Sequence, residues 1–136
     1  METGVIIATH GFSSVELLKS AEMIVGIQEN VETITFEEGQ GLEELSKSYQ
    51  ESLKKLSGCQ SILILVDLLG GSPFNVGALQ NHPLIAGVNI PMLLELFMKR
   101  DTVSLNQLVE VVLQVGKESI VTYTKEEKII EYDEEF

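Results

Sequence analysis

Positive charge is scarce in this chain of 136 residues. Lysines and arginines number 9 against 21 aspartates and glutamates, so the formal net charge is −12, and Arg100 is the only arginine. A nucleic-acid-binding protein needs a basic surface to displace counterions from phosphates, and a membrane-surface anchor needs a basic face. The composition therefore argues against nucleic-acid binding and favours a protein partner with a basic docking face. The alternative is that the acidic surface only confers solubility.

Cysteine and long apolar runs are equally sparse. The single Cys59 cannot form an internal disulfide and has no metal-ligand spacing around it. No apolar run approaches the ~20 residues that cross a bilayer, and the N-terminus shows no signal-peptide pattern. With two histidines and no clustered cysteines, neither a zinc site nor another cofactor is expected. These features indicate a cytoplasmic protein.

The residues that are present, 44% of them apolar, can form one domain with a core. Strand-like and helix-like patterns alternate along the chain. Continuous apolar runs at residues 4–9 and 61–66 are typical of strands buried on both faces. Further strands are predicted at residues 31–36, 84–88 and 119–123, and helices at residues 13–25, 42–56, 72 onward, 90–99 and 105 onward. Two of these helices begin with a predicted capping box, at Ser13–Glu16 and at Ser104–Gln107.

This alternation predicts an α/β fold with an open, mainly parallel central sheet and helices on both faces. The two most apolar strands, the first and the third, should lie in the middle. If they are neighbours from which later strands build outward in opposite directions, the crevice between their carboxyl ends is the place where ligands bind.

The first strand ends in Thr9-His10-Gly11 and the third runs into Asp67. Adjacent parallel strands would bring His10 and Asp67 together at one edge. A carboxylate that accepts a hydrogen bond from one ring nitrogen fixes the histidine tautomer and leaves the other nitrogen free to attack. We expect Asp67 to hold Nδ1 and Nε2 to be the nucleophile, although the sequence does not assign the nitrogens.

Gly70, Gly71 and Ser72 follow Asp67 directly. The glycines allow a tight turn and close approach to a ligand, and Ser72-Pro73 opens a helix whose free N–H groups favour an anion. The segment is not a Walker A loop, since the required lysine is absent. A phosphate site without arginine is better suited to a protein that passes the phosphoryl group on than to a protein that retains it.

Each signal has a plainer structural explanation when taken alone. His10 could cap a loop, and Asp67 could cap a turn. Among the other candidates, His82 is interpreted as a surface turn residue, Cys59 as a half-buried structural thiol, and Arg100 with Asp101 as solvated loop residues. The combination of His10, Asp67 and the glycines at one predicted edge carries the functional hypothesis.

Three segments in this order resemble a known family: residues 5–11 (VIIATHG), 67–75 (DLLGGSPFN) and 86–93 (AGVNIPML). They resemble the mannose-family enzyme IIA component of the bacterial phosphoenolpyruvate-dependent sugar phosphotransferase system. The resemblance covers roughly residues 3–123. It divides the chain into a IIA phosphocarrier domain at residues 1–123 and an acidic tail at residues 124–136.

The resemblance implies a phosphotransferase that works through a phosphohistidine. The family histidine that matches His10 receives phosphate from the histidine phosphocarrier HPr and donates it to a IIB component during sugar uptake. The family aspartate that matches Asp67 is its partner, and the segment matching Gly70, Gly71 and Ser72 borders the phosphoryl group. Such domains are homodimers that exchange a C-terminal strand, here residues 119–123, and they meet the membrane only through the transporter complex.

Three alternatives stay open at this point. The chain could be the phosphocarrier subunit of a dihydroxyacetone kinase, a non-catalytic regulatory module of the same fold, or a small hydrolase. The sequence does not indicate which sugar is transported, whether IIB is a separate or a fused component, or what the acidic tail does.

Overall fold

The computed structural model describes residues 2–125. Strands and helices alternate through most of the chain, as predicted. The strands are β1 (Thr3–His10), β2 (Val31–Phe36), β3 (Ser61–Val66) and β4 (Leu84–Ala86). The helices are α1 (Ser13–Val25), α2 (Leu42–Lys55), α3 (Ser72–Gly77), the 3₁₀ turn η1 (Ala78–Gln80), α4 (Ile90–Lys99) and α5 (Leu105–Glu118).

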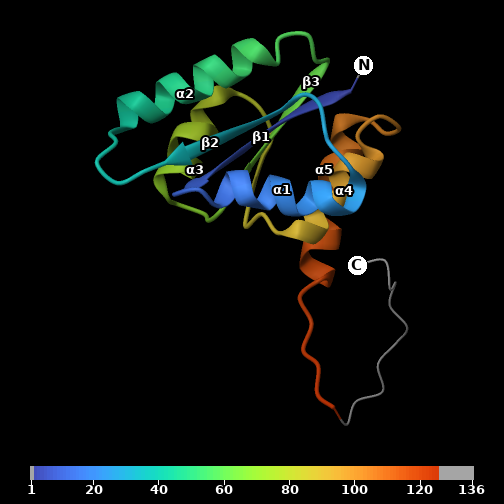
Figure 1. Ribbon diagram of the computed structural model, residues 1–136. Helices are drawn as coiled ribbons and strands as arrows, with labels where there is room; N and C mark the ends of the chain where they lie inside the picture. The colour runs from blue at the N-terminus through green and yellow to red at the C-terminus, as the bar shows by residue number, and fades with distance from the viewer. Residues whose placement is uncertain (1, 126–136) are drawn as a thin grey trace.

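The four strands form one parallel sheet in the order β2-β1-β3-β4 (Figure 1). The apolar strands β1 and β3 occupy its centre, and the more polar β2 lies at an edge, which confirms both predictions. The chain builds outward from β1 to β2 and, in the opposite direction, from β3 to β4. The crevice between the carboxyl ends of β1 and β3 is therefore the switch point at which open α/β sheets bind ligands.

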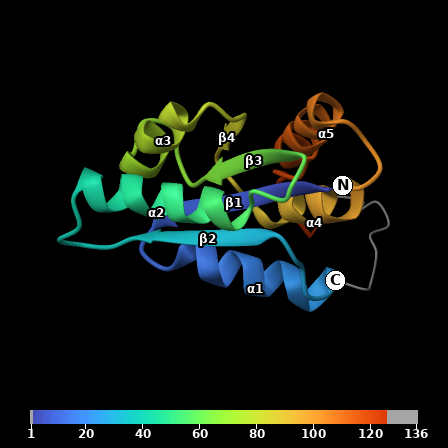
Figure 2. The same ribbon diagram turned by 90° about the horizontal axis from the view of Figure 1, so that it is seen from above.

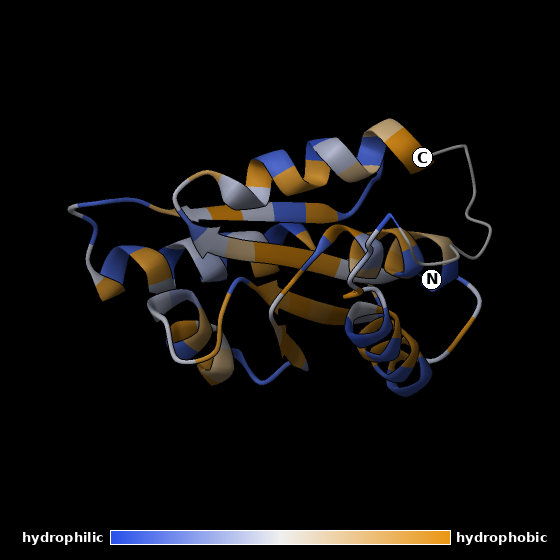
Figure 3. Ribbon diagram, turned by 90° about the horizontal axis from the view of Figure 1, so that it is seen from below, coloured by the Kyte–Doolittle hydropathy of each residue, from blue (hydrophilic) through white to orange (hydrophobic). Residues whose placement is uncertain are grey.

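Helices cover both faces of the sheet (Figure 2). Helices α2 and α3 pack on one face, and α1, α4 and α5 on the other. Alternate side chains of β1 enter the two cores: Val5 and Ile7 pack with α1 and α4, whereas Ile6 and Ala8 pack with α2 and α3. The apolar colouring of the central strands follows from this burial on both sides (Figure 3).

Residues 119–123, predicted as a strand exchanged between two subunits, do not form a strand within the single chain. Helix α5 ends at Glu118, and residues 119–125 have no regular secondary structure. They run away from the domain (Figure 1), and Ile120 and Val121 are 78% and 79% exposed. A strand needs a neighbour to satisfy its backbone groups, and the segment does not lie beside the sheet of its own chain. Most of the predicted acidic tail, residues 126–136, lies outside the described residues.

One predicted capping box is confirmed and the other is wrong. Ser104 accepts a hydrogen bond from the Gln107 backbone N–H, and the Gln107 side chain accepts one from the Ser104 N–H. Helix α1 instead has Phe12 at its N-cap, with no side-chain cap. The hydroxyl of Thr9 accepts the backbone N–H of Ser14 at 2.7 Å. A residue at the end of β1 thus accepts one of the free N–H groups in the first turn of α1.

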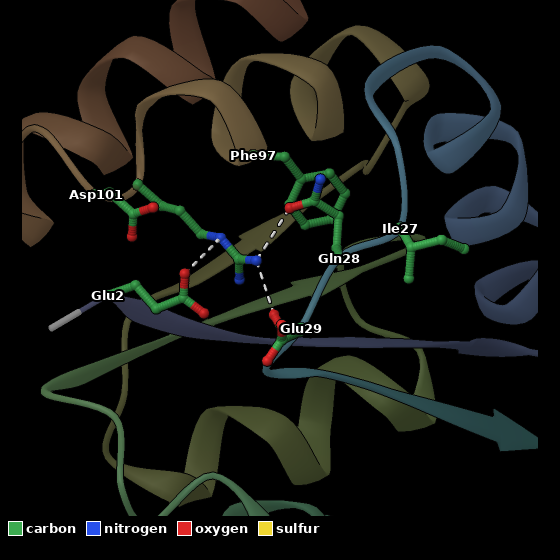
Figure 4. A pocket seen from close by; sticks show the side chains of 7 residues that line it. Glu2, Ile27, Gln28, Glu29, Phe97 and Asp101 are labelled. Carbon is green, nitrogen blue, oxygen red and sulfur yellow. Dashed lines mark hydrogen bonds and ion pairs between the residues drawn. The ribbon is translucent and has the colours of Figure 1, made fainter.

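Arg100 is buried, with 4% of its surface exposed, and is not the solvated residue that we predicted. Its guanidinium donates to the Glu29 carbonyl and the Gln28 side chain at 2.7 and 3.0 Å, and lies 3.5 Å from the Glu2 carboxylate (Figure 4). The Phe97 ring lies beneath it, 5.3 Å from ring centroid to Cζ. In the sequence, Arg100 is only a charged residue at the end of a helix. In the structure, the N-terminus and the α1–β2 loop cover it.

Candidate functional site

His10 is the last residue of β1, and Asp67 follows directly on β3. The two strands are paired in parallel, so both residues reach the same edge of the sheet. Nδ1 of His10 lies 2.8 Å from Oδ2 of Asp67, and the same oxygen accepts the His10 backbone N–H at 3.0 Å. The predicted juxtaposition is confirmed, and the nitrogen that faces the carboxylate is Nδ1.

The electrostatics of the pair favour an ionised carboxylate. Partial burial raises the pKa of Asp67, but hydrogen bonds from the backbone and the ring of His10 outweigh it, so that its pKa lies below the ordinary value of 3.8. A carboxylate at Nδ1 keeps the ring proton on that nitrogen and leaves the Nε2 lone pair available. The side chain of His10 is 47% exposed, so a partner protein can reach it.

The predicted glycine turn lies against the same histidine. Gly70 adopts a left-handed conformation with φ of 86°, which a glycine accepts without strain, and its carbonyl accepts a hydrogen bond from the Asn75 side chain. Gly71 is the N-cap of α3, and a Cβ atom there would lie 2.8 Å from Cε1 and 3.5 Å from Nε2 of His10. Ser72 begins α3. The backbone of this turn therefore borders the free nitrogen of the ring.

Two aromatic residues at the site were not identified from the sequence. The Phe36 ring at the end of β2 meets His10 edge to face, with centroids 5.9 Å apart and planes at 78°. Tyr49 of α2 is completely buried and donates its hydroxyl to the Pro73 carbonyl at 2.7 Å. Both residues looked like ordinary members of a strand and of an amphipathic helix. The sequence did carry one signal for Phe36. Neighbouring parallel strands end side by side, so the last residue of the second strand was expected near the end of the first strand.

Three exposed apolar side chains form an apolar rim on one part of the site. Phe12, Leu68 and Leu69 flank His10 and Asp67 in the chain and are 61%, 50% and 74% exposed. Large apolar side chains that face solvent around a reactive residue are typical of a protein-docking surface.

The remaining candidates lie in structural settings. Burial raises the pKa of the half-buried Cys59 thiol, which disfavours a reactive thiolate and agrees with the predicted structural role. His82 lies in a bend between η1 and β4. Within residues 2–125, no three His, Cys, Asp or Glu side chains converge as metal ligands.

Comparison with known proteins identifies the family. The family model "PTS system fructose IIA component" matches residues 4–113. The chain belongs to this enzyme IIA family of the phosphotransferase system. The predicted resemblance is thus confirmed over most of the chain.

The curated relatives of this enzyme IIA chain include components for several sugars. The chain is 42% identical over 126 residues to the mannose-specific EIIAB component of Escherichia coli and 33% identical over 120 residues to the fructose-specific EIIA component of Bacillus subtilis. These matches cover 88% and 85% of this chain. They cover 39% of the E. coli protein and 82% of the B. subtilis protein, so the chain spans about two fifths of the longer relative.

Solved structures share the fold. A phosphotransferase system component EIIA from Streptococcus agalactiae is 33% identical, with a TM-score of 0.80 over 88% of this chain and 96% of its own. A mannose/sorbose-specific IIA subunit from Enterococcus faecalis is 26% identical, with a TM-score of 0.84 over 95% and 100%. The observed parallel sheet with helices on both faces is therefore the family fold. None of the helices among residues 2–125 is long and apolar enough to cross a membrane.

Proposed function

We propose that this enzyme IIA chain carries a phosphoryl group on Nε2 of His10, accepts it from phosphorylated HPr and donates it to a IIB component during sugar uptake. The observation that carries the proposal is the 2.8 Å contact between Nδ1 of His10 and Asp67. Because that contact occupies one ring nitrogen, the other is the nucleophile.

Each transfer conserves the phosphoryl group. The Nε2 lone pair of His10 attacks phosphorus, the bond from phosphorus to the donor histidine breaks, and its electron pair returns to the donor. The Asp67 carboxylate stabilises the positive charge that the imidazole gains during the attack. Donation to IIB is the same exchange, in which His10 is the leaving group.

The surroundings of His10 suit temporary storage of the phosphoryl group. The single arginine is held at the opposite end of the sheet, where it binds the Thr3 carbonyl at the start of β1. The turn formed by Gly70, Gly71 and Ser72 lies beside the ring, because a Cβ at Gly71 would be 3.5 Å from Nε2, and Ser72 begins α3 next to it. We assign these three residues to the phosphoryl group, because neutral donors such as backbone N–H groups and a hydroxyl can hold it without the strong pairing that a guanidinium provides.

Membership of the enzyme IIA family also suggests how this chain assembles and docks. We infer a homodimer in which residues 119–123 pair with the partner subunit; their exposure in one chain supports this. The phosphocarrier domain would occupy residues 1–123 of a cytoplasmic protein, followed by the acidic tail at residues 124–136. The net charge of −12 suits partners with a basic docking face, and the apolar rim suits partners that bury apolar surface there.

Intact-protein mass spectrometry tests the proposal. The protein and a His10→Ala variant are incubated with phosphoenolpyruvate, enzyme I and HPr. We expect one acid-labile phosphoryl adduct on the wild type and none on the variant, with both proteins folded because His10 lies at an exposed edge. Absence of the adduct from the wild type, with phosphorylated HPr in the same tube, would contradict the proposal. Subsequent addition of a IIB protein should remove the adduct.

A further inference from the structure

Three separate elements contact the His10 ring. Asp67, after β3, holds Nδ1 at 2.8 Å. Gly71, before α3, lies close enough that any side chain there would collide with Cε1. Phe36, at the end of β2, meets the ring edge to face at 5.9 Å. The third contact has no part in the proton and charge chemistry described above.

We propose that Phe36 is a positioning residue, whose ring holds the His10 imidazole in the orientation that aims Nε2 at the incoming phosphorus. The inference rests on the proposed carrier function. It adds a residue that neither donates nor accepts a proton and acts only through the orientation of His10.

The orientation needs such a contact because the histidine side chain is half exposed. The torsion that turns an imidazole is broad, and a hydrogen bond at one nitrogen still permits the ring to tilt about that bond. Phosphoryl transfer requires the attacking nitrogen, phosphorus and leaving group to be nearly in line, so a tilt of Nε2 slows the reaction.

The backbone fixes Phe36 relative to His10 more firmly than an isolated ring contact would. The two residues are paired in register between β1 and β2. The Phe36 carbonyl also accepts the backbone N–H of Gly11 at 2.8 Å, immediately after the histidine. Edge-to-face aromatic pairs are favoured by the opposite charge of ring edge and ring face, so an aliphatic side chain of similar size does not reproduce the preference.

The test uses a small phosphoryl donor to separate positioning from docking. With phosphoramidate, Nε2 of His10 forms a bond to phosphorus, the phosphorus–nitrogen bond of the donor breaks, and ammonia leaves. No partner protein contacts the rim in this reaction. The full-length protein is compared with Phe36→Leu, with Phe36→Tyr, which keeps the ring, and with Phe97→Leu, which makes the same change at the far end of the sheet.

We expect Phe36→Leu to lower the rate of phosphorylation at saturating donor between about 2-fold and about 10-fold, the range that corresponds to one aromatic pair. Phe36→Tyr should restore the rate, and Phe97→Leu should leave it unchanged. The ¹H and ¹⁵N resonances of the His10 ring should shift in Phe36→Leu alone, while the remaining amide spectrum shows an intact fold.

Other outcomes overturn the inference. A normal phosphoramidate rate in Phe36→Leu, even with a raised KM for HPr, would make Phe36 a docking residue. A rate loss that persists in Phe36→Tyr would show that the aromatic ring is not what matters. Failure of the wild type to accept phosphate on His10 from either donor would instead contradict the proposed function itself.

Discussion

The Oδ2 atom of Asp67 accepts two hydrogen bonds from His10, one from the ring Nδ1 and one from the backbone N–H, although 57 positions separate the two residues. One carboxylate oxygen therefore fixes both the main chain and the side chain of the histidine. Loss of this oxygen should affect the orientation of the ring and the local backbone together.

Replacement of Asp67 should slow phosphoryl transfer without abolishing it. In Asp67→Ala the nucleophile remains, but its orientation and the stabilising charge are lost. We expect a decrease of about 10- to 100-fold, the cost observed when a carboxylate that orients a metal-binding histidine is removed. Rapid-quench measurement of transfer from phosphorylated HPr checks the rate. Asp67→Asn, which keeps an acceptor oxygen but not the charge, separates the two contributions, and a wild-type rate in both variants would refute the pairing.

The contribution of the same pair to stability should depend on pH at the acidic end. Because the folded-state pKa of Asp67 lies below its ordinary value of 3.8, the carboxylate stabilises the fold fully above that value. The stabilisation is lost as the pH falls through the lowered pKa. Urea unfolding of the wild type and Asp67→Asn at several pH values measures it. The difference in unfolding free energy should shrink as the pH falls below about 4; a difference that grows over that range would contradict the assignment.

Gly71→Ala should impair transfer far more than stability. Its Cβ would lie 2.8 Å from Cε1 of His10, so the exposed ring must move aside. The cost to the unfolding free energy should stay within about 1 kcal/mol, whereas a misplaced nucleophile can lose about 100-fold in rate. Thermal unfolding and transfer assays measure the two effects. Gly58→Ala is the control, since no atom lies within 4 Å of its Cβ position. Unimpaired transfer by Gly71→Ala would argue against close packing of the turn on the ring.

The apolar rim should matter only when the donor or acceptor is a protein. Leu69 is 74% exposed beside the site. Leu69→Ser should raise the KM for HPr roughly fivefold or more, the effect of losing a contact that contributes above about 1 kcal/mol. Its rate with phosphoramidate should be normal. Met23→Ser, at an apolar position that is 87% exposed near the C-terminal end of α1, serves as the control. Equal KM values for the two variants would exclude docking at Leu69.

Tyr49→Phe should destabilise the protein through one hydrogen bond. The buried Tyr49 hydroxyl donates to the Pro73 carbonyl, and phenylalanine would leave that acceptor without its donor. We expect a loss of about 1–3 kcal/mol in the free energy of unfolding, measured by urea denaturation. The control is Tyr123→Phe, at a position 61% exposed. An unchanged midpoint in Tyr49→Phe would show that this bond contributes nothing net.

Local sequence determined most of the secondary structure and the central pair of the site. The uninterrupted apolar runs of β1 and β3 can be buried only inside a sheet covered on both faces, and parallel strands end at the same edge. These two facts predict the proximity of His10 and Asp67 from pattern alone. The Ser104–Gln107 capping box was equally predictable, because its hydrogen bonds involve residues three positions apart.

Tertiary structure decided the features that depend on distant parts of the chain. The Ser13 capping box is absent because the N-cap of α1 is Phe12, one residue earlier than predicted, and the Glu16 N–H donates to the Phe12 carbonyl instead. Arg100 was predicted to be solvated, yet the N-terminus and the α1–β2 loop cover it. The packing of Phe36 and Gly71 on the His10 ring likewise joins segments that are remote in sequence. A hydrophobic or hydrogen-bonding pattern within a few residues specifies local conformation, whereas the partner that a side chain meets across the fold depends on how the helices and strands pack together.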